Sequence, residues 1–157
     1  MPTTTAAFDL KQALYTAVPL AVPAAAAGTV QVGYGYPTNL RDDSVLIMGV
    51  QTVQEWRTSN RSREETLEVE VVVSAWRVSA QAQLDADEAA YGYLELLDRY
   101  CRLTDPTLVG AGAPTGLIRE ISCTATEADG FTDKEWRQSG RGCEIRAAFT
   151  AHARISG

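Results

Sequence analysis

Apolar and polar residues alternate along residues 65–78, which predicts a β-strand with one buried face. Successive side chains of a strand point to opposite sides, so alternate positions share a face. One face is apolar and consists of Leu67, Val69, Val71, Val73 and Ala75. The other face is largely polar, with Thr66, Glu68, Glu70 and Ser74. Because burial of each valine contributes roughly 1.5–3 kcal/mol, this stripe can anchor a hydrophobic core.

A second alternating segment, residues 143–155, predicts a partner for that strand. Its odd positions are apolar: Cys143, Ile145, Ala147, Phe149, Ala151, Ala153 and Ile155. Its even positions are mostly polar, with Glu144, Arg146, Thr150, His152 and Arg154. This period is typical of an antiparallel sheet with one face on the core and one face in water.

Two helices are expected between the strands. The first covers residues 6–18 and should stop at Pro19, since proline breaks a helix. The second begins with Asp85 as N-cap and Glu88 three residues later, which is the spacing of a capping box, and runs to about Leu103. Both carry an apolar stripe at helical spacing.

The remaining segments complete an expected α+β fold. Strands are expected at residues 30–36, 45–54, 65–78, 117–127 and 143–155, with a long loop at 128–142. This order predicts a mostly antiparallel β-sheet with two α-helices packed on one face. At 157 residues the chain is expected to be a single domain, 1–157.

A short pattern, E-W-R-x-S-x-R, occurs at residues 55–61 and again at 135–141. Each copy precedes a long strand and is expected at a hairpin tip. Tryptophan and arginine are enriched at binding hot spots. The candidate interaction residues are therefore Trp56, Arg57, Arg61, Arg63, Trp136, Arg137 and Arg141. Three roles are open for these tips: solvated loops, contacts to a partner or another subunit, or contacts to a DNA backbone. We favour contact with protein, because a tryptophan ring that faces an aqueous channel would not be buried.

Charge and cysteine content narrow the possible functions. A net charge of −6 argues against nucleic-acid affinity over the whole surface, although a local basic patch remains compatible with it. The three cysteines, Cys101, Cys123 and Cys143, form no C-x-x-C motif, so neither a disulfide framework nor a zinc site is indicated. They are expected to be buried, reduced thiols.

No set of residues in the sequence predicts catalysis. The only histidine, His152, falls on the polar face of a strand, without a Cys or Ser motif beside it. The acidic pairs at residues 42–43 and 64–65 are expected to be turn and solvent-facing charges, because adjacent side chains diverge. We therefore expect no enzyme, no catalytic residue, no metal and no cofactor. Residues 17–27 are apolar but short and interrupted by prolines, so no membrane span is expected.

Several segments in order resemble the tail terminator proteins of long-tailed bacteriophages, in particular those of actinobacteriophages. They are the N-terminal helix, residues 30–37, 45–50, the strand from Arg63, residues 105–108 and residues 149–155. The resemblance extends along nearly the whole chain and includes no catalytic signature. The two E-W-R segments are the departure from the family's pattern.

The resemblance implies a structural virion protein made in the host cytoplasm and located at the head-proximal neck of the tail. Its subunits would form a homo-hexameric ring that caps the tail tube, ends tube polymerisation and joins the tail to a head-completion or stopper protein. Genomic DNA would pass through the lumen without sequence-specific binding. The alternatives are a head–tail connector (stopper), a tail tube subunit, or a small cytoplasmic ligand-binding or enzymatic α+β domain.

Overall fold

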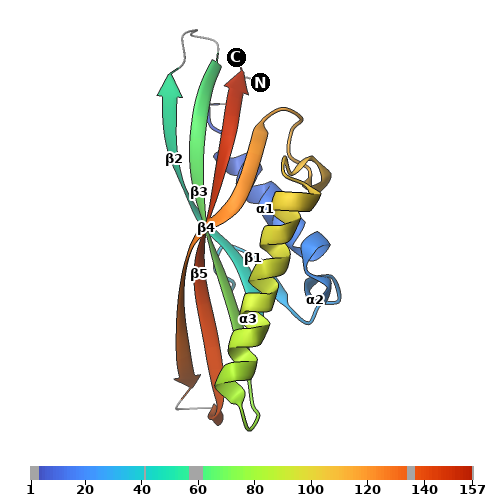
Figure 1. Cartoon of the computed structure of the whole chain (residues 1–157), viewed down its shortest axis with the longest axis vertical. Coiled ribbons are helices and arrows are strands. Elements are labelled where there is room, and N and C mark those ends of the chain that lie inside the picture. The colour runs from blue at the N-terminus through green and yellow to red at the C-terminus, as the bar shows by residue number, and fades with distance from the viewer. Residues whose placement is uncertain (1–3, 41, 57–61, 134–136, 157) are drawn as a thin grey trace.

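The computed structural model describes residues 4–40, 42–56, 62–133 and 137–156 (Figure 1). It has two layers, a five-stranded sheet and helices packed on one of its faces, which confirms the expected α+β fold. The strands are β1 (Gln31–Tyr34), β2 (Ser44–Trp56), β3 (Ser62–Arg77), β4 (Ile118–Asp133) and β5 (Arg137–Ser156). The helices are α1 (Ala7–Ala21), α2 (Pro23–Ala26) and α3 (Ala82–Arg99), followed by a π-helical turn (Tyr100–Thr104) and a short 3-10 turn (Val109–Ala111).

The central strands β3 and β5 have the faces that the alternation predicts. They pair antiparallel along their length, with Val71 opposite Ala147 and Val69 opposite Phe149. All the apolar positions of both alternating segments are buried. Because the side-chain period of a strand is two, this register keeps the apolar side chains of these alternating positions on the helix side of the sheet.

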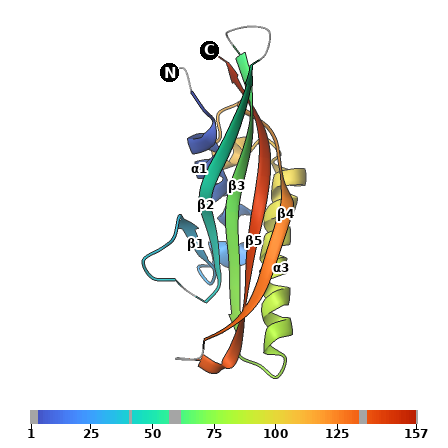
Figure 2. The same cartoon turned by 90° about the vertical axis from the view of Figure 1, so that its left-hand side faces the viewer.

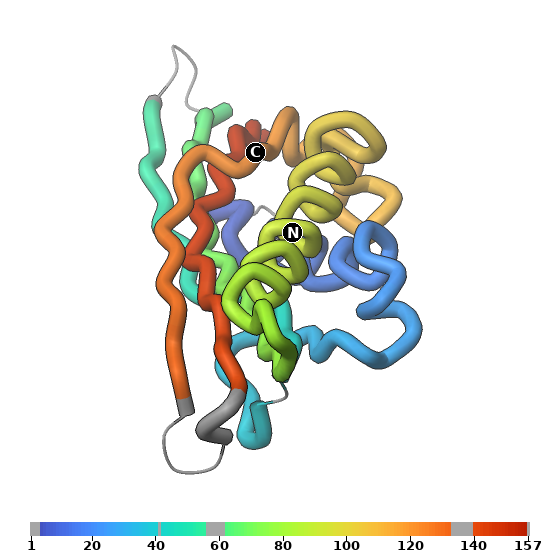
Figure 3. Tube along the Cα trace, turned by 60° about the horizontal axis from the view of Figure 1, so that its bottom comes forward, coloured from blue at the N-terminus to red at the C-terminus, as the bar shows by residue number. Residues whose placement is uncertain are grey.

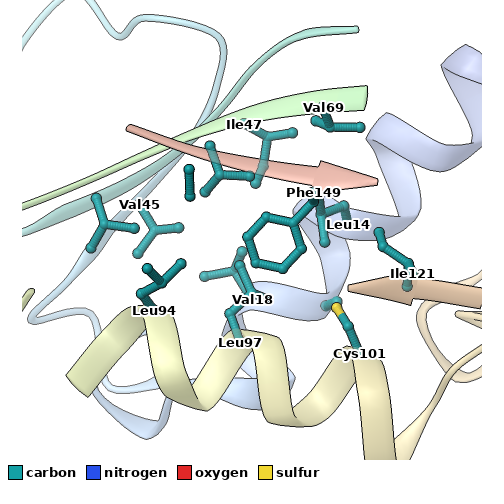
Figure 4. Packing of buried hydrophobic residues seen from close by; sticks show 14 of the residues in the cluster. Leu14, Val18, Val45, Ile47, Val69, Leu94, Leu97, Cys101, Ile121 and Phe149 are labelled. Atoms are coloured by element: carbon teal, nitrogen blue, oxygen red, sulfur yellow. The ribbon is translucent and has the colours of Figure 1, made fainter. Parts of the chain in front are cut away.

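The core fills the space between the sheet and the two long helices. Phe149 lies at its centre and is fully buried. Figure 4 shows it between Leu14 of α1 and Leu97 of α3. Branched side chains from β2 and β3, such as Ile47 and Val69, complete this layer.

One pairing in the sheet is parallel. The strand order is β1-β2-β3-β5-β4, and every neighbouring pair is antiparallel except β1–β2. Parallel neighbours need a connection that returns to the starting end. Residues 35–43 are sufficient here because β1 has only four residues.

Both predicted helix boundaries need correction. Pro19 does not stop α1, which continues to Ala21. Proline removes one intrahelical hydrogen bond, but this loss falls in the last turn of the helix. Asp85 is not the N-cap of α3, which begins at Ala82. Its carboxylate instead lies in the first turn and accepts a 2.5 Å hydrogen bond from Ser79 Oγ, where negative charge opposes the positive end of the helix dipole.

The prediction of a long loop at residues 128–142 is wrong. β4 continues to Asp133 and β5 begins at Arg137, so this segment is mainly a β-hairpin. Glycine makes this packing possible, because a Cβ at Gly140 would lie 2.2 Å from the ring of Trp76. Here the cross-strand pairing and this close contact outweigh the weak strand propensity of glycine.

Candidate interaction surfaces

The structure describes some of the predicted interaction residues and not others. Arg57, Arg61 and Trp136 lie outside the described residues. Trp56 is the last residue of β2 and Arg137 the first residue of β5.

The two E-W-R segments do not come together. Arg63 is opposite Ile155 at one end of β3, whereas Arg77 is opposite Arg141 at the other end. The fourteen residue-to-residue steps from Arg63 to Arg77 span roughly 46 Å at the rise of a β-strand. Figure 1 shows the β2–β3 hairpin and the β4–β5 hairpin at opposite ends of the long sheet. The predicted residues therefore form two separate surfaces.

Two arginines of this set, Arg63 and Arg141, make contacts within the chain. Arg63 donates to Gln54 Oε1 and to the carbonyl of Thr4, both across 3.3 Å. Arg141 donates to the carbonyl of Gly140 across 2.7 Å. Arg63 thus links the β2–β3 hairpin to the N-terminal segment.

Glu65 is not the solvent-facing charge that the sequence suggested. Its side chain is buried, on the same face of β3 as the valine stripe. The carboxylate accepts hydrogen bonds from Thr5 Oγ1 (2.7 Å), the backbone N–H of Ala6 (2.9 Å) and Gln54 Nε2 (2.6 Å). Glu65 is two residues from Leu67, and residues two apart on a strand share a face. This spacing was the signal that could have placed Glu65 on the buried face. Its hydrogen bonds offset the cost of burying a carboxylate.

Asp43 is likewise buried rather than exposed in a turn. It accepts hydrogen bonds from Arg77 Nη1 (2.8 Å), Tyr93 Oη (2.6 Å) and the backbone N–H of Trp76 (3.1 Å). Burial alone would raise the pKa of the Asp43 carboxyl, but the hydrogen bonds from Arg77, Tyr93 and Trp76 outweigh it and lower the pKa. This network ties the start of β2 to the end of β3 and to α3.

Figure 2 shows the sheet from the side turned away from the helices. Apart from the end where Leu46 and Trp76 are buried, the described side chains on this face are mostly polar and predominantly acidic. The strand register places these carboxylates on it: Glu55, Glu64, Glu68, Glu70, Glu120, Glu127, Asp129 and Glu144. Among the described residues, the basic side chains on the same face are fewer, namely Arg146, His152 and Arg154, together with Arg119, which pairs with Glu64 across 3.4 Å. His152 lies 3.3 Å from Thr66 Oγ1 and 3.6 Å from Glu120, which agrees with its expected place on the polar face.

A depression of about 550 Å³ opens among charged groups that include Glu64, Glu65, Arg119 and His152. Within the described ranges, no three His, Cys, Asp or Glu side chains gather as a metal ion would require. No helix among the described residues is long and apolar enough to cross a membrane.

Besides the outer side of the short strand β1, two longer stretches of sheet edge in the described part of the chain lack a neighbouring strand. The sequence did not reveal them. β1 pairs only with Ser44–Ile47 of β2, which leaves residues 50–56 of β2 as an open edge. β4 forms the opposite edge of the sheet. Its residues 124–132 are exposed on both faces. Nearer its start, Asp98 Oδ1 accepts a hydrogen bond from the backbone N–H of Cys123 across 2.9 Å, which covers that part of the edge.

A scan against protein-family models and a search of curated proteins find no match to this chain. Among solved structures, the chain is similar to one described as "Virion of native gene transfer agent (GTA) particle", with a TM-score of 0.52 and 17% sequence identity. The alignment covers 99% of this chain and 100% of that chain. At this identity the likeness shows a shared fold, and this fold extends over the whole of both chains.

Proposed function

We propose that this chain is a structural protein of a phage-like virion, and more specifically a tail terminator that closes into a homo-hexameric ring. The observation that carries the proposal is the pair of unlike open edges, β2 and β4, on opposite sides of one sheet. An exposed edge strand is a template for pairing with another chain. A ring needs two different, complementary surfaces on each subunit.

The strand directions suit this pairing. β2 is antiparallel to β3, β3 to β5 and β5 to β4. β2 and β4 therefore run in opposite directions. When the open part of β2 in one subunit lies beside β4 of the next, the sheet continues antiparallel from subunit to subunit. Repetition of this contact around an axis covers both of these open stretches.

The open portions of the two edges lie at different heights, which favours a tilted arrangement. Val53, in the open part of β2, is paired with Thr66 of β3, which is paired with His152 of β5. His152 is paired in turn with Glu120 of β4, so Val53 and Glu120 lie at the same height along the strands. The open part of β4 is centred near Glu127, seven residues further along. Pairing Val53 with Glu127 would shift neighbouring subunits by roughly 23 Å along the strands. Closed barrels require such a stagger.

The acidic outer face of the sheet suits the lining of a channel for DNA. A surface with carboxylates in excess repels phosphates, so a polyanion can pass without being held. Binding to DNA would instead need lysines and arginines that neutralise phosphates. The two hairpin ends, which point away from each other, would then contact different proteins, the tail tube protein at one end and a head-completion or stopper protein at the other.

The alternative roles differ in what they demand of the surface. A stopper or a tube subunit of the same fold would also form rings, and a tube subunit would stack on copies of itself at both ends. A ligand-binding domain or an enzyme would need a pocket with mostly apolar walls and a few convergent polar groups. The depression beside His152 is lined mostly by charged and polar side chains, and we expect no enzymatic activity, cofactor or metal.

Two measurements test the proposal: the mass of the protein in solution and electron microscopy of labelled particles. We expect mass photometry to detect a species of six subunits, either alone or after addition of tube protein. Immunogold against the protein should label the junction of head and tail. Particles made without it should be separate heads and overlong tails. Label along the whole tail, or normal tails in its absence, would contradict the proposal.

A further inference from the structure

The helix layer is incomplete beneath β4. α1 packs against β1 and β2, while α3 packs mainly against β3 and β5. Thr126 and Ala128 of β4 point to the helix side, as their partners Ala147 and Ile145 show, yet both are exposed. Their side chains are small, and this face of β4 is uncovered. Figure 3 shows β4 (orange) running down one side of the molecule, apart from α3. We call this uncovered face, together with the adjacent side of α3, the trough.

One wall of the trough is the adjacent side of α3. Gln83 donates to the carbonyl of Gly142 and to Asp87 Oδ1, so these two side chains lie toward the β4–β5 hairpin. Tyr91 follows Asp87 by four residues and therefore lies on the same side of the helix. Its ring is 47% exposed. The trough thus combines small side chains, an aromatic ring and a carboxylate.

The opposite side of the molecule carries an exposed aromatic stripe. Phe8, Lys11 and Tyr15 lie on one side of α1 by their helical spacing. Phe8 is 64% exposed and Tyr15 is 36% exposed. Tyr34, at the end of β1, packs edge-on against Tyr15 with ring centroids 5.8 Å apart, and Lys11 Nζ lies 4.3 Å from the centre of the Tyr34 ring.

We infer that the aromatic stripe of one subunit (Phe8, Lys11, Tyr15 and Tyr34) fills the trough under β4 of the adjacent subunit. This inference rests on the proposed ring and names a second layer of its contact. Large aromatic side chains on one copy meet small ones on the other, and Lys11 brings a positive charge toward Asp87.

The stagger of the strands places the two surfaces at the same height. Ala6, at the start of α1, is held at the level of Glu65. Glu65 is paired with Ala153 of β5, and Ala153 is paired with Ile118 of β4, so Glu65 and Ile118 lie at the same height. Pairing Val53 of one subunit with Glu127 of the next shifts the two subunits by seven residues. The level of Ala6 in the first subunit then coincides with about Ala125 of β4 in the second. Phe8, slightly further along, then lies beneath Thr126 and Ala128.

A cysteine cross-link tests the contact directly. The double variant Phe8→Cys, Ala128→Cys is made in a Cys123→Ser background, so that the partly exposed native thiol does not react. Within one chain β2 and β4 are three strand spacings apart, about 14 Å. A disulfide needs Cα atoms within about 7 Å, so the bond can form only between subunits.

Mild oxidation of the double variant should give a ladder of covalent species that ends at a closed ring. Each single variant should give at most a dimer. The control pair Phe8→Cys, Val78→Cys uses another exposed site and should give no ladder. Both variants should keep the parent's melting temperature, since Phe8 and Ala128 are exposed.

The outcomes separate this inference from the proposed function. If rings form by mass photometry but the double variant gives no ladder, the inference is wrong and the ring stands. If the double variant stays monomeric at every concentration, alone and with tube protein, the inference is also overturned. Immunogold labelling of particles then decides independently whether the protein belongs at the neck.

Discussion

The carboxylate of Glu65 accepts a 2.9 Å hydrogen bond from the backbone N–H of Ala6, fifty-nine residues away in sequence. The first backbone N–H groups of a helix have no partner within the helix, and a negative charge there is favourable. Thr5 Oγ1 accepts from the next N–H, that of Ala7, across 3.2 Å. β3 therefore supplies the acceptor for the N–H of Ala6, the N-cap residue, which has no capping side chain of its own.

Replacing Glu65 should consequently destabilise the fold. We expect Glu65→Ala to reduce the free energy of unfolding by about 1–3 kcal/mol, because the buried N–H of Ala6 and the partly buried donors of Thr5 and Gln54 lose their acceptor. Urea denaturation followed by circular dichroism measures this change. The control Glu68→Ala, on the exposed face of the same strand, should stay within about 0.5 kcal/mol of the parent. Equal effects of the two substitutions would contradict the capping role.

The Asp43 network should make stability depend on pH in acid. Because its pKa is lowered below the ordinary value of 3.8 in the folded protein, ionised Asp43 stabilises the fold above that value. This contribution is lost as the pH falls through the lowered folded pKa. Asp43→Asn should therefore reduce stability most near neutral pH and progressively less in acid. Denaturation curves over a pH series test this; a constant difference at every pH would refute it.

The two faces of β3 should respond oppositely to charge. Val71→Asp places a carboxylate in the fully buried face and should abolish folding, since this cost approaches the stability of a whole domain. Val72→Asp is the matched control, because Val72 lies next in sequence on the partly exposed face. The control should fold and melt cooperatively. A cooperative melt of the Val71→Asp protein would show that the face assignment is wrong.

The three thiols should react at different rates. Burial raises the pKa of Cys101 and of Cys143 to about 12, and both side chains are buried. Cys123 is only partly buried. Ellman's reagent at pH 8 should therefore modify one thiol of the native protein quickly and all three after unfolding. Cys123→Ser should remove the fast phase; a fast phase that persists would mean that another thiol is accessible.

The arginines of the two E-W-R segments should act separately, because the hairpins lie at opposite ends of the sheet. The double variants Arg57→Glu, Arg61→Glu and Arg137→Glu, Arg141→Glu should both fold, as circular dichroism would show. If each end contacts a different virion protein, one variant should give unjoined heads and tails and the other should give overlong tails. Infectious particles with tails of normal length from both variants would mean that these arginines are only solvated.

Alternation along the chain was enough to predict β3 and β5, because a half-buried strand repeats every two residues. It also placed His152 on the polar face. Alternation also assigns Glu65 to the apolar face, but the pairs of adjacent acidic residues at 42–43 and 64–65 were interpreted as solvent-facing charges. That interpretation failed for Glu65 and Asp43, since their burial depends on partners that are distant in sequence, Ala6 for one and Tyr93 for the other. A local pattern carries no information about such partners.

The alternation of apolar and polar residues also could not predict how far β4 and β5 extend. Residues 128–142 contain glycines and charges that usually mark a loop. The strand conformation of residues 128–133 and 137–142 follows from their pairing with each other. The open edges could not be foreseen, because an edge is a property of strand order. The two E-W-R segments were grouped by sequence likeness alone, and the strand register separates them.

The pairing of Val71 with Ala147 has a consequence for synthesis of the protein. β3, the middle of the sheet, cannot acquire its neighbour β5 until residues up to 156 have been made. At roughly 5–20 residues per second, a ribosome needs about 4–16 s to translate the chain from the end of β3 to that point. During this interval the valine stripe lacks half of its sheet, and contacts so distant in sequence form slowly. The nascent chain should therefore engage chaperones, and β4, half of the proposed ring contact, should become competent for assembly only at the end of translation.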